Sequence, residues 1–394
     1  MTKKSDAPAI RFKGFSDAWE QRKLGEMGQT YTGLSGKTKD DFGHGQARFV
    51  TYMNVFSNPI SNPEMTEPIE IDPKQNEVEV GDVFFTTSSE TPEEVGMSSI
   101  LLEKRGKTYL NSFCFGFRPS EKIDSYYLAY MLRSESTRAK IILLAQGISR
   151  YNISKNKVME IAVSLPSLDE QKMIGQYFSQ LDNLITLHQR KFEKLTNVKK
   201  SMLEKMFPQN GSSYPEIRFK GFTDPWEQRK AKEICSIGTG KSNTQDQVDD
   251  GKYPFYIRSD VPVRSNKYLY DCEAVITIGD GNIGKVFHYV NGKFDLHQRC
   301  YKMTDFKDIW GKYFFYYFST KFYDRAMKMT AKATVDSVRL EMISEMDIKK
   351  PPQISEQKQI AEFFANLDNL ITLHQRELEK LQNIKKSMLE KMFV

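Results

Sequence analysis

Residues 170–207 read EQKMIGQYFSQLDNLITLHQRKFEKLTNVKKSMLEKMF, and residues 356–393 read EQKQIAEFFANLDNLITLHQRELEKLQNIKKSMLEKMF. The two segments are identical at 28 of 38 positions at a constant offset of 186, and the block LDNLITLHQR is unchanged. A shorter repeat precedes each of them: residues 10–23 (IRFKGFSDAWEQRK) recur as residues 217–230 (IRFKGFTDPWEQRK). The chain is therefore a tandem duplication, with a period far longer than the 20 to 50 residues of stacked solenoid repeats.

The repeated segments have the pattern of long amphipathic helices. Apolar residues recur every three or four positions from Ile174 to Met202, and no proline interrupts the run. Asp169 and Ser355 are cap-type residues at the two starts. At 1.5 Å per residue each helix would be roughly 57 Å long, which exceeds the diameter of a small domain. We therefore expect the two similar stripes to pair as an antiparallel coiled coil.

The expected pairing residues form equivalent sets in the two helices. They are Leu181, Leu184, His188 and Leu195 in the first helix, and Leu367, Leu370, His374 and Leu381 in the second. The two histidines lie within the stripe. We expect them to set the pairing register, with a ligand or pH-switch role as the alternative.

The repeats also predict the domain organisation and the fold class, which is α/β (α+β) with an internal pseudo-two-fold repeat. The predicted segments are a flexible tail (1–9), a first variable domain (10–168), a first helix (169–207), a Pro- and Gly-punctuated linker (208–216), a second variable domain (217–355) and a second helix (356–394). Short strands are expected at 48–55, 82–86, 255–261 and 274–278, with short aromatic-rich helices at 125–138 and 309–322.

The composition describes an ordinary globular protein, with 39% hydrophobic and 27% charged residues. We expect a cytoplasmic protein, because no apolar run approaches the ~18 residues of a membrane span and the first residues lack the apolar core of a signal peptide. The four cysteines are scattered without a C-x-x-C pair, so we expect reduced thiols and no metal site. The net charge of +6 permits a polyanionic partner without requiring one.

The motifs favour a binding protein over an enzyme. GDGNIG at residues 279–284 spells a dinucleotide fingerprint, but the following KVFHYV is strand-like, where a nucleotide site needs a helix. We interpret it as a hairpin loop that lets backbone approach a partner, followed by a strand and a turn at Asn291-Gly292. Asp224-Pro225-Trp226 lacks a proline of the amino-methyltransferase element and is interpreted as a capped turn. No phosphate-binding loop, nucleophile elbow or nuclease signature is found.

Polar and basic residues gather in the variable stretches, and such side chains suit phosphates and base edges of DNA. The alternative for any one of them is a solvated loop residue. The candidates are Lys37, Lys39, Arg48, Ser88, Ser89, Arg150, Tyr151 and Asn152 in the first stretch, and Lys241, Asn243, Arg258, Arg264, Asn282, Lys285, Gln298, Arg299 and Lys332 in the second.

These features together resemble the specificity subunit of type I restriction-modification systems, over nearly the full chain. The resemblance rests on the P-x-L-x-E-Q-type helix starts at 166–171 and 352–357, the LDNLITLHQR helices, the FKGF-x-D-x-W tags and the glycine loop IGDGNIGKV. The first variable stretch departs from this pattern, since its matching loop, TTSSETPEEVG, has no such glycines.

The resemblance implies two target-recognition domains, each reading half of a bipartite sequence in double-stranded DNA, with the helix pair as spacer. It also implies two modification subunits that bind S-adenosylmethionine and flip the target adenine, and restriction subunits that use ATP and Mg²⁺. This chain would bind no cofactor, carry no catalytic residue and touch no membrane. A coiled-coil adaptor with two protein-binding domains is the alternative, and a third idea, that the chain is itself a methyltransferase or nuclease, requires activity without partners.

Overall fold

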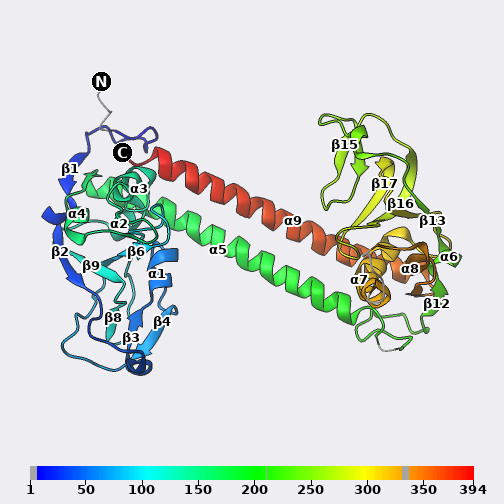
Figure 1. Cartoon of the computed structure of the whole chain (residues 1–394), viewed down its shortest axis with the longest axis horizontal. Helices are drawn as coiled ribbons and strands as arrows, with labels where there is room; N and C mark the ends of the chain where they lie inside the picture. Colours follow the sequence, from blue (N-terminus) through cyan, green and yellow to red (C-terminus); the bar gives the residue numbers. More distant parts are fainter. Residues whose placement is uncertain (1–6, 210, 331–336) are drawn as a thin grey trace. The chain divides into compact units, whose positions relative to one another are not determined.

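The computed structural model describes residues 7–209, 211–330 and 337–394. The chain divides into two compact units: unit 1 is Met1–Gln189 with Arg376–Val394, and unit 2 is Arg190–Gln375. Each unit contains one variable stretch, the beginning of one long helix and the end of the other (Figure 1). Most of the tail predicted at 1–9 lies outside the described residues.

The two long helices are α5 (Leu168–Lys205) and α9 (Ile354–Lys391), each of 38 residues. Their length matches the expectation, but the caps do not. Ser167 caps α5, since its Oγ accepts from the backbone N–H of Glu170 at 3.4 Å, and Asp169 lies in the first turn, where its charge suits the helix dipole. Ser355 lies inside α9.

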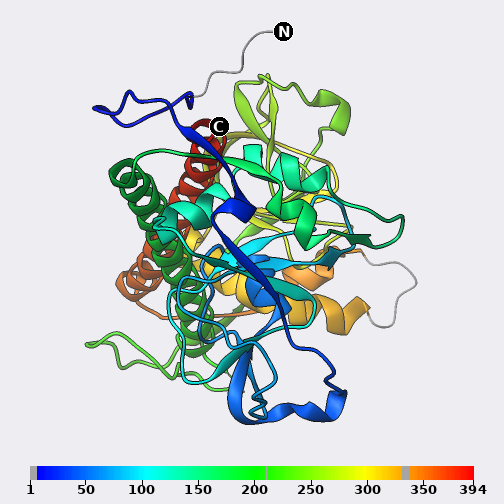
Figure 2. The ribbon, with the colours of Figure 1, turned by 90° about the vertical axis from the view of Figure 1, so that its left-hand side faces the viewer.

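Unit 1 is built from small sheets packed with short helices, and Figure 2 views it with its blue to cyan strands toward the viewer. One sheet has the order β2-β9-β5-β7, another β4-β3-β8, and β1 pairs with β11 and β6 with β10. The strands are β1 (Glu20–Lys23), β2 (Gly28–Thr32), β3 (Phe42–Val50), β4 (Thr66–Ile69), β5 (Val83–Thr86), β6 (Ser88–Ser89), β7 (Ser98–Ile100), β8 (Thr108–Leu110), β9 (Cys114–Pro119), β10 (Tyr151–Asn152) and β11 (Ala162–Leu165). The helices besides α5 are η1 (Leu24–Glu26), η2 (Lys39–Asp41), α1 (Tyr52–Ser57), α2 (Ser125–Met131), α3 (Glu135–Ile142) and α4 (Lys155–Met159).

Unit 2 has one larger sheet, with the strand order β13-β18-β16-β17-β14-β15, and the pair β12-β19. The strands are β12 (Glu227–Lys230), β13 (Ser236–Thr239), β14 (Tyr253–Tyr256), β15 (Val263–Ser265), β16 (Tyr270–Ile278), β17 (Phe287–Leu296), β18 (Cys300–Thr304) and β19 (Asp347–Lys350). The helices besides α9 are α6 (Ala231–Ile234), η3 (Thr244–Asp246), α7 (Gly311–Thr330) and α8 (Leu340–Ser344).

The short repeated tag fastens the start of each long helix. In unit 1, the guanidinium of Arg11 donates to both carboxylate oxygens of Glu170 at 2.6 and 2.8 Å. In unit 2, Arg218 does the same to Glu356 at 2.7 and 2.8 Å. Both glutamates are fully buried, so each is held by the bidentate pairing that a buried carboxylate needs.

An aromatic core then closes around each helix start. In unit 1 the ring of Phe178 on α5 packs against Phe393 with centroids 5.6 Å apart, and Trp19 meets Tyr127 edge-on at 6.2 Å. The end of α9 is therefore packed against the beginning of α5. Unit 2 repeats the arrangement with the equivalent residues Phe364, Phe207, Trp226 and Tyr313.

Some local predictions were wrong. The predicted strand 48–55 ends at Val50 and turns into α1, because Thr51 accepts from the N–H of Asn54 and caps a helix there. The predicted turn at Asn291-Gly292 is the middle of β17, where the φ of +131° at Gly292 is absorbed within the strand. The strand at 255–261 is confirmed only through Tyr256.

Candidate DNA interface

In unit 1 the short pair β6–β10 brings four of the candidate DNA-binding residues together. Tyr151 is paired with Ser89 and Asn152 with Ser88. The turn before β10 is closed by two reciprocal backbone hydrogen bonds of 2.9 Å between Gln146 and Asn152. These pairings join two segments that lie more than 50 residues apart in the sequence.

The turn depends on Gly147. Its φ is +142°, and a Cβ there would lie 2.0 Å from the carbonyl oxygen of Arg150. The turn places Arg150 on the surface, with its guanidinium 5.7 Å from the ring centroid of Phe113.

A cavity of about 770 Å³ lies beside this turn, lined in part by Ser88, Ser89 and Arg150. Tyr52 and Phe56 of α1 stack at 6.0 Å on its wall, and the Tyr52 hydroxyl donates to the carbonyl oxygen of Ser88 at 2.7 Å. The cavity therefore offers aromatic faces, hydroxyl groups and a guanidinium, which are groups that contact bases and sugar-phosphate.

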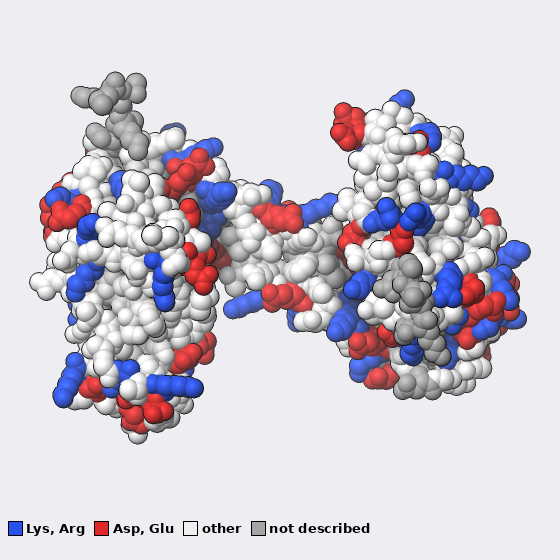
Figure 3. All heavy atoms as spheres, viewed as in Figure 1, with Lys and Arg blue, Asp and Glu red and all other residues white. Residues whose placement is uncertain are grey.

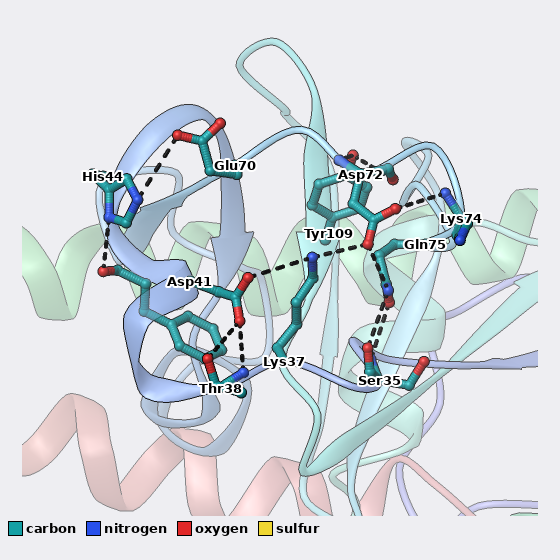
Figure 4. A network of polar contacts seen from close by, with 11 residues as sticks. Ser35, Lys37, Thr38, Asp41, His44, Glu70, Asp72, Lys74, Gln75 and Tyr109 are labelled. Carbon is teal, nitrogen blue, oxygen red and sulfur yellow. Dashed lines mark hydrogen bonds and ion pairs between the residues drawn. The ribbon is translucent and has the colours of Figure 1, made fainter.

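Two other candidates of unit 1 are used inside the fold. The Nζ of Lys37 lies 2.8 Å from Oδ2 of Asp72, and only 13% of its side chain is exposed (Figure 4). The Nε of Arg48 donates to Oγ1 of Thr66 at 2.6 Å, and its other arm reaches the Thr66 carbonyl. Lys39 is exposed on η2.

The lysine partner changes the acidity of Asp72. Hydrogen bonds from Lys37 first, and then from the backbone N–H of Lys74 and the amide of Gln75, hold the pKa of this carboxyl well below its usual range. The group therefore stays ionised at neutral pH, and the network shown in Figure 4 fixes the loop that carries Lys37.

In unit 2 the candidates converge on the glycine loop. That loop connects the antiparallel strands β16 and β17, which confirms the interpretation as a hairpin loop. Nη1 of Arg299 donates to Oδ2 of Asp280 at 2.7 Å, and Nη1 of Arg258 lies 3.2 Å from both carboxylate oxygens. A cavity of about 290 Å³ adjoins Asp280, Gln298 and Arg299.

The remaining candidates of unit 2 differ in their surroundings. The amide of Gln298 donates to Oδ1 of Asn243 at 2.5 Å, beside Arg299. Arg264 donates to the carbonyl oxygens of Gly251 and Lys252 at 2.8 and 2.9 Å and holds a loop. Lys241, Asn282 and Lys285 are exposed, and the Nζ of Lys285 lies 5.6 Å from the ring centroid of Tyr323. Lys332 lies outside the described residues.

Asp280 and the aromatic wall of the first cavity are not among the residues predicted from the sequence. Asp280 lies inside the GDGNIG motif, whose glycines are its recognisable feature. The carboxylate lies between two loops that each carry an arginine. These loops are separate in the sequence, and strands β14, β17 and β18 bring them to the same edge of the sheet.

The charges of the surface are mixed. Figure 3 shows Lys and Arg interspersed with Asp and Glu on the visible face of each unit. In the part of the chain that the structure describes, no group of three or more His, Cys, Asp and Glu side chains is arranged to hold a metal ion. Within the same ranges, no helix is both long and apolar enough to cross a membrane.

The helix-pairing candidates divide into inward and outward residues. Leu181 and Leu367 are 7% and 8% exposed, and His188, Leu195, His374 and Leu381 are half-buried. Leu184 and Leu370 are 44% and 43% exposed, so the pairing role expected for them is wrong. The neighbouring Ile185 and Ile371 are half-buried in their place.

The spacing of apolar residues seven positions apart explains why Ile185, and not Leu184, is half-buried. Seven residues on either side of Ile185 stand Phe178 and Phe192, whereas seven residues after Leu184 stands Lys191. The register through Ile185 is therefore apolar in both directions, whereas the register through Leu184 reaches a lysine.

Comparisons with known proteins agree with this architecture. The family model described as "Type I restriction modification DNA specificity domain" matches residues 16–197 and 223–383. The specificity subunit of the type I restriction enzyme MjaVIII from Methanocaldococcus jannaschii is 27% identical over 323 residues, which cover 74% of this chain and 74% of that protein. The putative MjaX specificity subunit from the same organism is 23% identical over 398 residues, covering 94% and 92%.

A solved structure has the same fold. The S subunit of a type I restriction-modification system from M. genitalium aligns with a TM-score of 0.70 at 14% identity, over 98% of this chain and 99% of that one. With two family matches that together span most of the sequence, the chain belongs to the type I restriction-modification DNA specificity family, whose members are the non-catalytic DNA specificity subunits of these systems.

Proposed function

We propose that each unit reads one half of a bipartite site in double-stranded DNA. The observation that carries this proposal is the contrast between repeated and variable parts. The tag recurs with two substitutions, and the Arg–Glu pair and the aromatic core recur at equivalent positions, whereas the loops around the two cavities differ. A scaffold that is kept while its loops diverge suits two surfaces that bind different sequences of one polymer.

The two loop surfaces differ in chemistry as well as in sequence. Unit 1 offers stacked aromatic rings, serines and Arg150, and unit 2 offers Arg258, Arg299 and an amide pair. Side chains of these types read base edges in the major groove, while Lys and Arg on the rim contact phosphates. Each surface would therefore select its own half-site.

We further propose that the long helices dock two modification subunits, one on each copy of the repeated helix surface. Leu184 and Leu187 on α5 are 44% and 46% exposed, and their equivalents Leu370 and Leu373 on α9 are 43% and 52% exposed. Exposed leucines at i and i+3 form an apolar spot on an otherwise polar helix face. Two identical spots suit two copies of one partner.

In this proposal the chemistry belongs to the partners. The modification subunits bind S-adenosylmethionine and methylate adenine, and the restriction subunits use ATP and Mg²⁺. This chain supplies the DNA surfaces and the spacing between half-sites, which the helix pair sets; one turn of DNA, about 34 Å, is the expected order of that spacing.

A domain exchange tests the proposal. The stretch 24–168 or the stretch 231–355 is replaced by that of a relative, the methyltransferase is reconstituted with modification subunits, and methylated adenines are mapped in genomic DNA. Each exchange is expected to change one half of the methylated sequence and to leave the other half unchanged. An unaltered methylated sequence would contradict the proposal and would favour the adaptor with two protein-binding domains.

The spacing role has its own test. Insertion of one helical turn after Leu187, with a matching insertion in α9, should lengthen the spacer between the two half-sites without changing their bases. As the control, residues 170–207 are replaced by the sequence of residues 356–393, because this exchange keeps the length of the helix. An unchanged spacer in the insertion variant would overturn the spacing role.

A further inference from the structure

Two arginines from separate loops share one carboxylate in unit 2. Arg258 follows β14 and Arg299 precedes β18, and both donate to Asp280 in the glycine loop, at 3.2 and 2.7 Å. The exposed fractions of the side chains are 44% for Arg258 and 62% for Arg299, against 21% for Asp280. The carboxylate therefore lies beneath two guanidinium groups that face solvent.

The backbone around Asp280 is fixed on both sides. The N–H of Gly279 donates to the carbonyl oxygen of Arg299 at 2.8 Å, and the carbonyl oxygen of Gly279 accepts from Val338 at 2.7 Å. A Cβ at Gly279 would lie 2.6 Å from the Arg299 carbonyl, so the close approach of these two loops requires glycine. Gly281 follows with a φ of +82°.

Arg299 is held at its own backbone as well. Its N–H donates to Nδ1 of His297 at 3.1 Å, which requires that nitrogen to be unprotonated. Burial, and then the charge of Arg258, lower the pKa of His297, which favours the neutral ring. The guanidinium thus stands on a rigid base, held at the backbone by His297 and at the side chain by Asp280.

The carboxylate distinguishes two kinds of DNA contact. A site that only attracts phosphate gains from bare positive charge, and an ionised Asp beside it removes part of that charge. A site that reads a base gains from a guanidinium fork whose orientation is fixed, because bidentate bonding to O6 and N7 of guanine requires one plane and one direction. The Gln298–Asn243 amide pair beside Arg299 adds groups of the kind that read base edges.

We propose that Asp280 is a positioning residue that aims Arg299, supported by Arg258, at a guanine in the half-site read by unit 2. This inference rests on the proposed function and goes beyond it, because it names a base and the residue that selects it. The half-site of unit 2 should therefore contain at least one guanine whose major-groove edge is required.

The test uses the reconstituted methyltransferase and duplexes that carry its mapped site. Arg299→Ala should lower affinity about 10-fold or more for the site. 7-Deazaguanine at the contacted position removes N7 and keeps O6, so it should lower the affinity of the unaltered protein by a smaller factor. The loss caused by Arg299→Ala should be smaller on the 7-deazaguanine duplex than on the guanine duplex. Arg229→Ala, an exposed arginine on β12, is the control and should leave binding unchanged.

Asp280→Asn should relax the preference for guanine at that position while the dependence of affinity on salt stays the same, and Asp280→Glu should restore part of the preference. If Asp280→Asn does not fold, Asp280→Glu tests the positioning role, and the Arg299→Ala experiment with 7-deazaguanine tests the contact with guanine. An Arg299→Ala loss that is equal for all sequences, with a salt slope reduced by about one, would show a phosphate contact and overturn the inference. A unit 2 half-site without guanine would also overturn the inference. A methylated sequence that stays the same after the domain exchange would overturn the proposed function instead.

Discussion

Nζ of Lys385 on α9 lies 2.5 Å from Oδ1 of Asp182 on α5, and the same aspartate accepts from the hydroxyl of Tyr130 at 2.8 Å. Unit 2 repeats the triad at equivalent positions. Lys199 lies 2.5 Å from Asp368, which accepts from the Tyr316 hydroxyl at 2.7 Å. In each unit one carboxylate therefore ties both long helices to the aromatic helix of the variable domain.

This relationship predicts the effect of removing one carboxylate charge. Asp182→Asn keeps the shape but weakens two charge-assisted bonds that are partly buried, so we expect a loss of about 1–3 kcal/mol. Asp368→Asn should cost a similar amount, and the two losses should add, since the residues share no partner. Urea unfolding of the purified chain measures both.

Lys172→Ala provides the control for that experiment. Lys172 pairs with Asp169 across a surface where the two side chains are 53% and 84% exposed. Such pairs contribute about 0–0.5 kcal/mol. An Asp182→Asn effect as small as that of the control would show that the triad does not stabilise the helix pair.

The basic candidates of unit 1 divide into residues that are used inside the fold and residues on the surface. This division gives a second prediction. Lys37→Ala should lower stability, because Lys37 holds Asp72 in the network of Figure 4, and it should leave the salt dependence of DNA binding unchanged. Arg150→Ala should do the reverse, weakening DNA binding with little effect on unfolding. Thermal unfolding and salt-titrated binding to the methylated site measure the two effects, and a steep loss of affinity in the folded Lys37→Ala variant would contradict this division.

The sequence predicted the fold well wherever the signal was repeated or periodic. The two 38-residue helices follow from the apolar spacing, and the tandem units follow from the repeated tags. The role of the tag is visible only in the structure: Arg11 and Arg218 are half-buried partners of buried glutamates more than 130 residues away. No local pattern identifies a partner at such a distance.

The candidate site was predicted only in part, for the same reason. Residue type suggested Lys37 and Arg48 as DNA contacts as strongly as Arg150, but the first two are used by Asp72 and Thr66 inside the fold. Strand pairing, which brings β10 beside β6, decided which residues share a surface. Leu184 is a different case, since the seven-residue spacing of Phe178, Ile185 and Phe192 is a local pattern that already favours Ile185 over Leu184.

The exposed leucines of the long helices give a third prediction. Leu184→Lys with Leu187→Lys should remove one of the two proposed docking surfaces, so that native mass spectrometry should find one modification subunit in place of the two expected for the unaltered chain. Leu370→Lys with Leu373→Lys should have the same effect, and all four together should abolish assembly. Folding should be unaffected, because these side chains are roughly half exposed.

Thr186→Lys is the control for the leucine variants, since it places a lysine at an exposed position of the same helix turn without removing a leucine. It should bind two modification subunits. Full assembly of the fourfold lysine variant would show that the partners dock elsewhere.

His288 predicts a dependence of stability on pH. Burial lowers the pKa of this ring below about 6.5, although the contact of its Nε2 with the Ser259 carbonyl at 3.2 Å and the charge of Asp260 act in the opposite direction. The folded state therefore prefers the neutral ring. The stabilisation is complete above pH 6.5 and is lost as the pH falls through the folded-state pKa.

His288→Gln keeps an N–H for the Ser259 carbonyl and removes the titration. The decrease of the urea midpoint between pH 7 and pH 5 should become smaller in this variant, with the remainder due in part to His297, whose pKa is also lowered by burial. His44→Gln, with a side chain 58% exposed, is the control. Identical pH profiles for His288→Gln and the unaltered chain would contradict the prediction.

The last prediction concerns a difference between the two long helices at one equivalent position. Gly175 lies inside α5, and a Cβ there would be 2.6 Å from Oδ1 of Asp124 and 2.7 Å from the backbone nitrogen of Tyr127, the two atoms that form the cap of α2. The equivalent residue of α9 is Ala361, which is fully buried.

An ordinary Gly→Ala change inside a helix stabilises by about 1 kcal/mol, but overpacking costs about 1–3 kcal/mol. We therefore expect Gly175→Ala to lower the free energy of unfolding despite its better helix propensity. Ala361→Gly should lower it as well, by about 1 kcal/mol, and urea unfolding measures both. A Gly175→Ala variant that is more stable than the unaltered chain would mean that α2 can move away from α5 at little cost, and that the glycine is not required by the cap.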